Sequence, residues 1–196
     1  MGSSADGRYA ERAESVFSIE DVVSWESGGY RKCELIACFG GMQIDRFGNT
    51  NMIGVGSEYP RLKVRGPGTV GLYFATRFHR VWYVAAHHVR QVFCERVDFV
   101  SCPGRTAQRR EMCAPHSEGP VRCVTPLCVF GFDPSGEMVV ESLHAGVSED
   151  TVRENTGWDV KFADEIAETC PPSELELGLL RKVIDPLGVL ARIKLD

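Results

Sequence analysis

The chain has 196 residues, of which 43% are hydrophobic and 25% are charged, and its formal net charge is −5. This composition is typical of a globular protein and excludes disorder, collagen and coiled coil for the whole chain. The acidic balance argues against a nucleic-acid partner, and no apolar run reaches the ~18 residues of a membrane span. Because the N-terminus lacks the apolar centre of a signal peptide, we expect a flexible tail over 1–15, one domain over 16–196 and a cytoplasmic location.

The first half of the domain predicts short buried strands joined by glycine-rich turns. A helix is expected to begin near Ser18 and to end at Gly28. The apolar run 33–39 is typical of a strand that is buried on both faces, as in a parallel sheet. Residues 40–56 predict a tight polar turn between short strands. Further strands are expected over 61–64, 81–86, 96–101, 121–132 and 137–144.

The second half combines loops, helices and one more strand. Residues 102–120 predict a long polar loop, and a strand is expected over 158–162. One helix is expected over 148–157, and a second begins with a capping box formed by Ser173 and Glu176. Together these elements predict an α/β fold with a mixed, mainly parallel sheet flanked by helices.

Eight cysteines are many for this length. No two are spaced as Cys-x-x-Cys, so neither a zinc ribbon nor a thioredoxin-like site is expected, and we predict no metal. Cys123 and Cys128 lie five apart in one apolar run, as do Cys33 and Cys38, and that spacing on a strand places the side chains on opposite faces. We therefore expect reduced thiols that are mostly buried.

A glycine-rich turn is the first candidate for a binding site. Its residues are Gly66, Pro67, Gly68, Thr69, Val70 and Gly71. Glycines let a ligand approach the backbone, and free N–H groups at a helix start attract anions or a developing oxyanion. The alternative is an ordinary tight turn, since the segment matches neither a Walker loop nor a full Gly-x-Gly-x-x-Gly pattern.

A group of polar side chains after the strand 33–39 is the second candidate. Gln43, Asp45, Asn49 and Asn51 lie within one short segment at the end of this buried strand. In α/β sheets the carboxyl ends of the strands face the ligand crevice. The alternative is a turn that is stabilised by hydrogen bonds of its own side chains.

Histidines and arginines give weaker signals. Consecutive residues on a strand point opposite ways, so at most one of His87 and His88 faces a site, and a buried structural histidine is the competing interpretation. Two basic clusters predict either phosphate contacts or solvated loop charges: Arg105, Arg109 and Arg110 in the polar loop, and Arg61, Lys63 and Arg65 beside the glycine-rich turn.

The run LIACFGGMQIDRFGNTNMIGVG resembles the beta subunit of glutaconate-type CoA-transferases, which are class I CoA-transferases. The pieces that follow are similar in the same order: VRGPGTVG, an apolar strand, RVDFVSCPG and the tail that begins SLHAGVSEDTVRENTGWDV. The similarity covers about residues 16–190. The VRGPG form of the turn, and the HAG after SL, look closest to the branch that includes the steroid-ring-opening CoA hydrolases.

This resemblance implies a NagB/RpiA/CoA-transferase-like fold and an alpha partner subunit, in a heterodimer or heterotetramer, with an acyl-CoA site at their interface. A coenzyme A thioester would be the substrate, with no permanently bound cofactor. The backbone of residues 66–69 would lie near the thioester. We therefore expect this turn and the four polar side chains at 43, 45, 49 and 51 to bind the acyl-CoA, and we assign no catalytic residue.

Beta subunits of the family resembled carry a βα unit and, in the transferases, a glutamate that attacks the thioester, well before the run LIACFGG. This chain begins too late for that unit, so we expect the fold without its first βα unit. Glu26, followed by Ser27 and Gly28, matches part of the motif, and we interpret this as a coincidence. The expected function is CoA transfer, or a glutamate-independent hydrolysis, ring opening or decarboxylation; the alternative is a non-catalytic subunit that stabilises an alpha partner.

Overall fold

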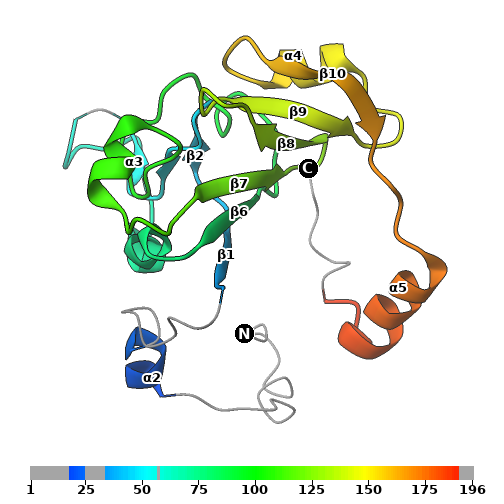
Figure 1. Ribbon diagram of the computed structural model, residues 1–196, viewed down its shortest axis with the longest axis horizontal. Coiled ribbons are helices and arrows are strands. Elements are labelled where there is room, and N and C mark those ends of the chain that lie inside the picture. The colour runs from blue at the N-terminus through cyan, green and yellow to red at the C-terminus, as the bar shows by residue number, and fades with distance from the viewer. Residues whose placement is uncertain (1–17, 25–33, 57, 190–196) are drawn as a thin grey trace. The chain divides into compact units, whose positions relative to one another are not determined.

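The computed structural model describes residues 18–24, 34–56 and 58–189 (Figure 1). These residues fall into two units, Met1–Glu34 and Leu35–Asp196. In the first unit the described residues form the helix α2 (Ile19–Ser24), which begins at Ser18 as expected. The side chains of Ser18 and Asp21 each accept a hydrogen bond from the other's backbone N–H. The expected tail and Glu26 lie outside the described residues.

A six-stranded mixed sheet forms the second unit (Figure 1). Its strands, in spatial order, are β1 (Ile36–Phe39), β6 (Arg80–Val84), β7 (Gly119–Val124), β8 (Cys128–Phe132), β9 (Met138–Leu143) and β10 (Lys161–Glu168). The pairs β1–β6, β6–β7 and β9–β10 are parallel, whereas β7–β8 and β8–β9 are antiparallel. The predicted α/β fold with a mixed, mainly parallel sheet is confirmed.

Two small antiparallel pairs lie between β1 and β6 in the chain. The first joins β2 (Gln43–Ile44) to β3 (Thr50–Asn51), and the second joins β4 (Gly54–Val55) to β5 (Val64–Arg65). The chain then forms a 3-10 helix, η2 (Val70–Thr76), and enters β6. Residues 66–69 of the glycine-rich turn thus connect β5 to η2, and its last two residues, Val70 and Gly71, begin η2.

Three further helices follow, and two of them are capped as the sequence predicts. In α4 (Glu149–Asn155) the Ser148 side chain accepts from the N–H of Thr151. In α5 (Glu174–Leu179) both bonds of the Ser173 and Glu176 capping box are present, and the helix continues as a wider turn, η3 (Leu180–Ile184). The remaining helix, α3 (Ala107–Met112), lies before β7. Among the described residues, no helix is both long and apolar enough to cross a bilayer.

The core packs against one face of the sheet. On β6, Val81 and Tyr83 are fully buried, whereas Trp82 and Val84 are exposed on the opposite face. An aromatic group formed by Phe93, Phe130 and Trp158 stacks within the core, with ring centroids 5.9–6.4 Å apart. This rigid core fixes the ends of β1 and β6.

Several predicted elements differ from the structure. The expected strand 61–64 is reduced to β5, which begins only at Val64. The expected strand 96–101 is irregular, and only a bridge between Thr50 and Cys102 joins its end to β3. The expected single strand 121–132 is two strands, because Thr125 Oγ1 accepts from the N–H groups of residues 127 and 128 and turns the chain. The polar loop 102–120 contains α3, and the last strand begins later than expected, at Lys161.

The seven cysteines among the described residues are free thiols. Cys102, Cys123 and Cys128 are fully buried, and burial raises the pKa of Cys102 to about 11 and of Cys128 to about 12. The expectation of buried thiols holds for these three, whereas Cys38 and Cys170 are exposed. Cys123 and Cys128 lie on neighbouring strands rather than on one, so the spacing argument did not apply to them.

Candidate functional site

The carboxyl ends of the parallel strands β1 and β6 open onto a cavity of about 630 Å³. We call it the strand-end cavity, and its lining is mostly apolar: Phe39, Gly40, Gly41, Met42, Met52, Pro67, Thr69, Gly71, Leu72, Val84, Ala85, Ala86, His87 and Val92. Its volume is typical of a small-molecule site, and its place at the ends of parallel strands is where α/β proteins bind ligands.

Two glycines after β1 let the chain pass closely behind this cavity. A Cβ on Gly40 would lie 2.9 Å from the carbonyl oxygen of Val84, and one on Gly41 would lie 2.7 Å from Thr50 Cγ2. Since real Cβ atoms do not approach so closely, neither position accepts a side chain without a shift of its neighbours. The Gly-Gly pair therefore sets how β1 leaves the sheet beside the end of β6.

The glycine-rich turn forms one wall of the strand-end cavity through Pro67 and Thr69. The turn is held from behind, because the N–H groups of Gly66 and Gly68 donate to the carbonyls of Ile53 and Met52 at 2.8 and 3.0 Å. A Cβ on Gly66 would lie 2.2 Å from the Met52 oxygen, so this glycine is required by packing.

Gly68 differs from Gly66 in what surrounds it. Its φ is +91°, a conformation that L side chains rarely adopt, yet a Cβ there would meet no atom within 4 Å. The turn therefore leaves open space beside a backbone segment that only glycine readily forms. Neither Gly66 nor Gly68 lines the strand-end cavity, although Pro67 and Thr69 do, and Gly146 and Gly188 combine a positive φ with open space in the same way.

The four polar side chains of the second candidate bind one another and the nearby backbone. Asn51 Nδ2 donates to Gln43 Oε1 at 2.6 Å and to the Gly54 carbonyl at 2.8 Å. The Asp45 carboxylate accepts from the backbone N–H and from Nδ2 of Asn49 at 2.9 and 2.8 Å, and burial raises its pKa. None of the four lines the strand-end cavity. Their bonds stabilise the segment that carries Met42 and Met52, and a direct contact with a ligand stays a prediction.

The two consecutive histidines divide as expected. His87 is exposed and lines the strand-end cavity. His88 is 5% exposed, and its ring nitrogens lie 2.9 Å from Thr125 Oγ1 and 3.0 Å from Thr156 Oγ1. Burial lowers the pKa of His88 to about 4. One histidine thus faces the site and the other is structural.

Most of the apolar lining was not predicted as part of a site. Phe39 and Val84 lie 45 positions apart in the sequence and meet because β1 pairs with β6. A sequence signal existed, since both residues end strands whose carboxyl ends face a crevice in α/β folds. The expectation that the first of these strands is buried on both faces is wrong, because Ile36 and Cys38 are exposed on one face of β1. The basic residues Arg61, Lys63 and Arg65 are exposed outside the cavity, and Arg65 stacks over the Tyr59 ring.

Relatives of known function place the chain in a family. No protein-family profile matches it. It is 33% identical over 184 residues to the beta subunit of the 3-oxoadipate CoA-transferase of Pseudomonas knackmussii, covering 91% of this chain and 69% of that protein. It is also 36% identical over 159 residues to the cholesterol ring-cleaving hydrolase IpdB subunit of Mycobacterium tuberculosis, covering 78% of this chain and 61% of that protein.

Solved structures agree with these relatives. The crystal structure of glutaconate coenzyme A-transferase from Acidaminococcus fermentans superposes with a TM-score of 0.83 at 26% identity, covering 97% of this chain and 74% of that chain. The chain thus spans between three fifths and three quarters of the length of these three proteins. The shared fold and the extent of the sequence identity lead to one conclusion: this chain belongs to the family of CoA-transferase beta subunits.

Proposed function

We propose that this chain is the beta subunit of a two-subunit enzyme that acts on an acyl-CoA thioester, with the acyl group in the strand-end cavity. The observation that carries the proposal is the mostly apolar 630 Å³ space at the ends of β1 and β6, closed on one side by the glycine-rich turn. An apolar lining favours a hydrocarbon acyl chain, and Pro67 and Thr69 form the part of the wall beside which the thioester would lie. A cytoplasmic location and the absence of a permanently bound cofactor, both expected from the sequence, are part of this proposal.

His87 is the candidate for proton transfer. It is the one titratable side chain among the described residues that line the strand-end cavity. A histidine beside a thioester can accept a proton from an attacking water or donate one to a leaving group, and such catalysis contributes typically 10²–10⁴-fold. We expect His87→Gln to lower kcat by about this factor at an unchanged melting temperature. His116→Gln is the matched control, because His116 is exposed and lies outside the strand-end cavity, where it contacts the Arg77 carbonyl and the His79 ring.

A product mass assay tests the function itself. The chain is co-expressed with an alpha subunit of the family, and the pair is supplied with a panel of acyl-CoA esters, with and without a free carboxylate acceptor. A new acyl-CoA that forms only with the acceptor indicates transfer, gain of water indicates hydrolysis, and loss of carbon dioxide indicates decarboxylation. No change across the panel would contradict the proposal and favour a non-catalytic role for this chain.

A further inference from the structure

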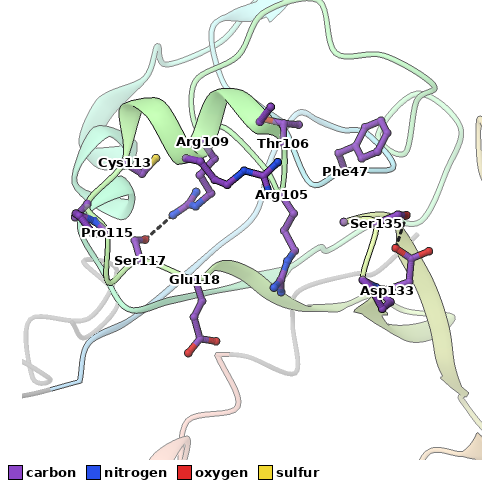
Figure 2. Close-up of a pocket in the computed structure, with 15 residues that line it drawn as sticks. Phe47, Arg105, Thr106, Arg109, Cys113, Pro115, Ser117, Glu118, Asp133 and Ser135 are labelled. Carbon is purple, nitrogen blue, oxygen red and sulfur yellow. Dashed lines mark hydrogen bonds between the residues drawn. The ribbon is translucent and has the colours of Figure 1, made fainter.

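A second pocket lies at the opposite end of the sheet from the strand-end cavity. Its volume is about 540 Å³, and we call it the arginine pocket (Figure 2). It is formed by α3, by the segment that leads into the amino end of β7, and by the turn 133–136 between β8 and β9. Because β8 runs antiparallel to β7, this turn returns to the amino end of β7. The pocket is therefore separate from the proposed acyl-CoA site.

Three arginines line this pocket: Arg105, Arg109 and Arg110. Figure 2 shows the hydrogen bond from Arg109 to Ser117 on one side of the view and Asp133 and Ser135 on the other, with Arg105 between them. The three arginines of the loop 102–120, for which the sequence predicts either phosphate contacts or solvated charges, thus line the same pocket. No ion pair joins any of the three arginines to a carboxylate among the described residues.

Arg109 is a buried cation whose partners are neutral. It is only 4% exposed, and it donates to the Pro103 carbonyl and to Ser117 Oγ, each at 2.6 Å. Gly119 makes room for it, because a Cβ there would lie 2.5 Å from Arg109 Nε. Burying a charge without a counter-ion is costly. The fold therefore fixes a guanidinium at the pocket wall and leaves its charge uncompensated.

The carboxylates of the pocket do not supply that counter-ion. Glu118 forms an ion pair with Arg80 at 3.4 Å, and Asp133 forms one with Lys161 at 2.9 Å. Asp133 also accepts from the Ser135 hydroxyl and from the Glu137 N–H. In addition, Thr106 Oγ1 is buried in the lining without a hydrogen-bond partner among the described residues. Each acid is thus engaged by a base from outside the pocket, while donors inside it remain unmatched.

We propose that the arginine pocket binds a small molecule through its phosphate groups. Guanidinium groups bind phosphate through paired, charge-assisted hydrogen bonds, and hydroxyls such as Thr106 Oγ1 add a further donor. The volume exceeds that of one phosphate ion and fits a phosphorylated metabolite. Since the pocket and the strand-end cavity lie at opposite ends of the same sheet and share no lining residue, occupancy here is compatible with a bound acyl-CoA.

Calorimetric titration of the full chain with pyrophosphate tests this site. We expect saturable binding that Arg110→Gln weakens by about tenfold or more, since charge-assisted hydrogen bonds are lost. Arg110 is exposed and makes no described contact, so this variant keeps the fold. Arg105→Gln should weaken binding likewise, although it also removes a bond to the Pro120 carbonyl. Arg96→Gln, an equal change of charge at an exposed position outside the pocket, should leave the affinity unchanged.

Three results would overturn the proposal. The first is no saturable binding, or equal weakening by all three variants, which would indicate a general charge effect. The second is tighter binding of malonate than of pyrophosphate, which would replace phosphate by carboxylate as the ligand group. The third is loss of pyrophosphate binding when saturating coenzyme A is present, which would place the phosphates in the acyl-CoA site. The titration needs no turnover, so its failure and a failure of the acyl-CoA proposal are distinguishable.

Discussion

Gly68 holds a backbone conformation that carries a cost for every other residue. At a φ of +91° an L side chain is strained even though a Cβ would have space. We expect Gly68→Val to re-form the turn with a different backbone path and to displace Pro67 and Thr69 from the cavity wall. Turnover of the two-subunit enzyme should then fall by at least about tenfold, since displacements near 1 Å cost more than that.

A substitution at a second glycine distinguishes the effect of backbone strain from an effect on the strand-end cavity. Gly146 has a φ of +78° and also has no atom within 4 Å of a built Cβ. Gly68 lies between two residues that line the strand-end cavity, whereas neither chain neighbour of Gly146 lines it. Gly146→Val should lower the melting temperature by a similar amount, a few degrees, and leave kcat unchanged. Equal turnover of the two variants would show that the turn at Gly68 does not contact substrate.

His88 makes stability depend on pH. The ring is surrounded by Phe93, Phe130 and two threonine hydroxyls, and the one titratable neighbour described is Cys128, whose pKa burial raises to about 12. The folded state therefore favours the neutral ring, with a pKa of about 4, whereas the unfolded state titrates near 6.5. The contribution of His88 to the free energy of unfolding is fully present above about pH 6.5 and is lost as the pH falls toward 4. The loss between pH 7 and pH 5 is about 2 kcal/mol.

Urea unfolding at these two pH values measures the effect. The wild-type chain should lose stability between them, and His88→Gln should lose about 2 kcal/mol less, because its side chain does not titrate. The variant will be less stable at pH 7, because the glutamine side chain does not have the shape of the neutral imidazole that lies between the hydroxyls of Thr125 and Thr156. An unchanged loss of stability in the variant would assign the pH dependence to other groups.

Helix and strand boundaries are predicted correctly where hydrogen bonds between residues close in the sequence determine them. The capping boxes at Ser173 and Ser148 define helix starts correctly because their hydrogen bonds close within one turn. The run 121–132 wrongly predicts one strand, because the chain stays hydrophobic through the turn between β7 and β8. The residue that forms this turn is Thr125, whose hydroxyl accepts two backbone hydrogen bonds. The helix α3 was missed because its polar composition gives no sign that Arg109 is buried.

The candidate site divides in the same way. Of the predicted binding residues, Pro67 and Thr69 line the strand-end cavity, because the glycine spacing that marks their turn is visible in the sequence. His87 was only one of two histidines of which at most one was expected to face a site, and contact of any of these residues with a ligand stays a prediction. The apolar lining was missed because its members meet only through the pairing of β1 with β6. The four polar side chains after β1 were recognised as a group. Their spacing alone does not show whether they form hydrogen bonds with one another, as they do here, or with a ligand.

At the scale of the whole molecule, the main feature is an exposed apolar strip on one face of the sheet, at the edge formed by β1 and β6. The strip consists of Ile36 and Cys38 on β1 and of Trp82 and Val84 on β6. Cys38 and Trp82 are paired across the two strands and so lie on the same face. Among the described residues β1 has a neighbour on one side only, which makes it an edge strand of the sheet. An apolar strip beside an open edge is typical of a surface that another chain covers.

We expect an alpha subunit of the family to cover this strip, and thiol labelling tests it. Cys38 in the strip and Cys170 after β10 are both exposed, so both should react with a maleimide in the isolated chain. In the complex, labelling of Cys38 should slow by at least about tenfold, because a packed interface excludes water and reagent, whereas that of Cys170 stays unchanged. Equal labelling of Cys38 with and without the alpha partner would place the interface elsewhere. A Cys38 that is protected in the isolated chain only at high concentration would instead identify a second copy of this chain as the occupant.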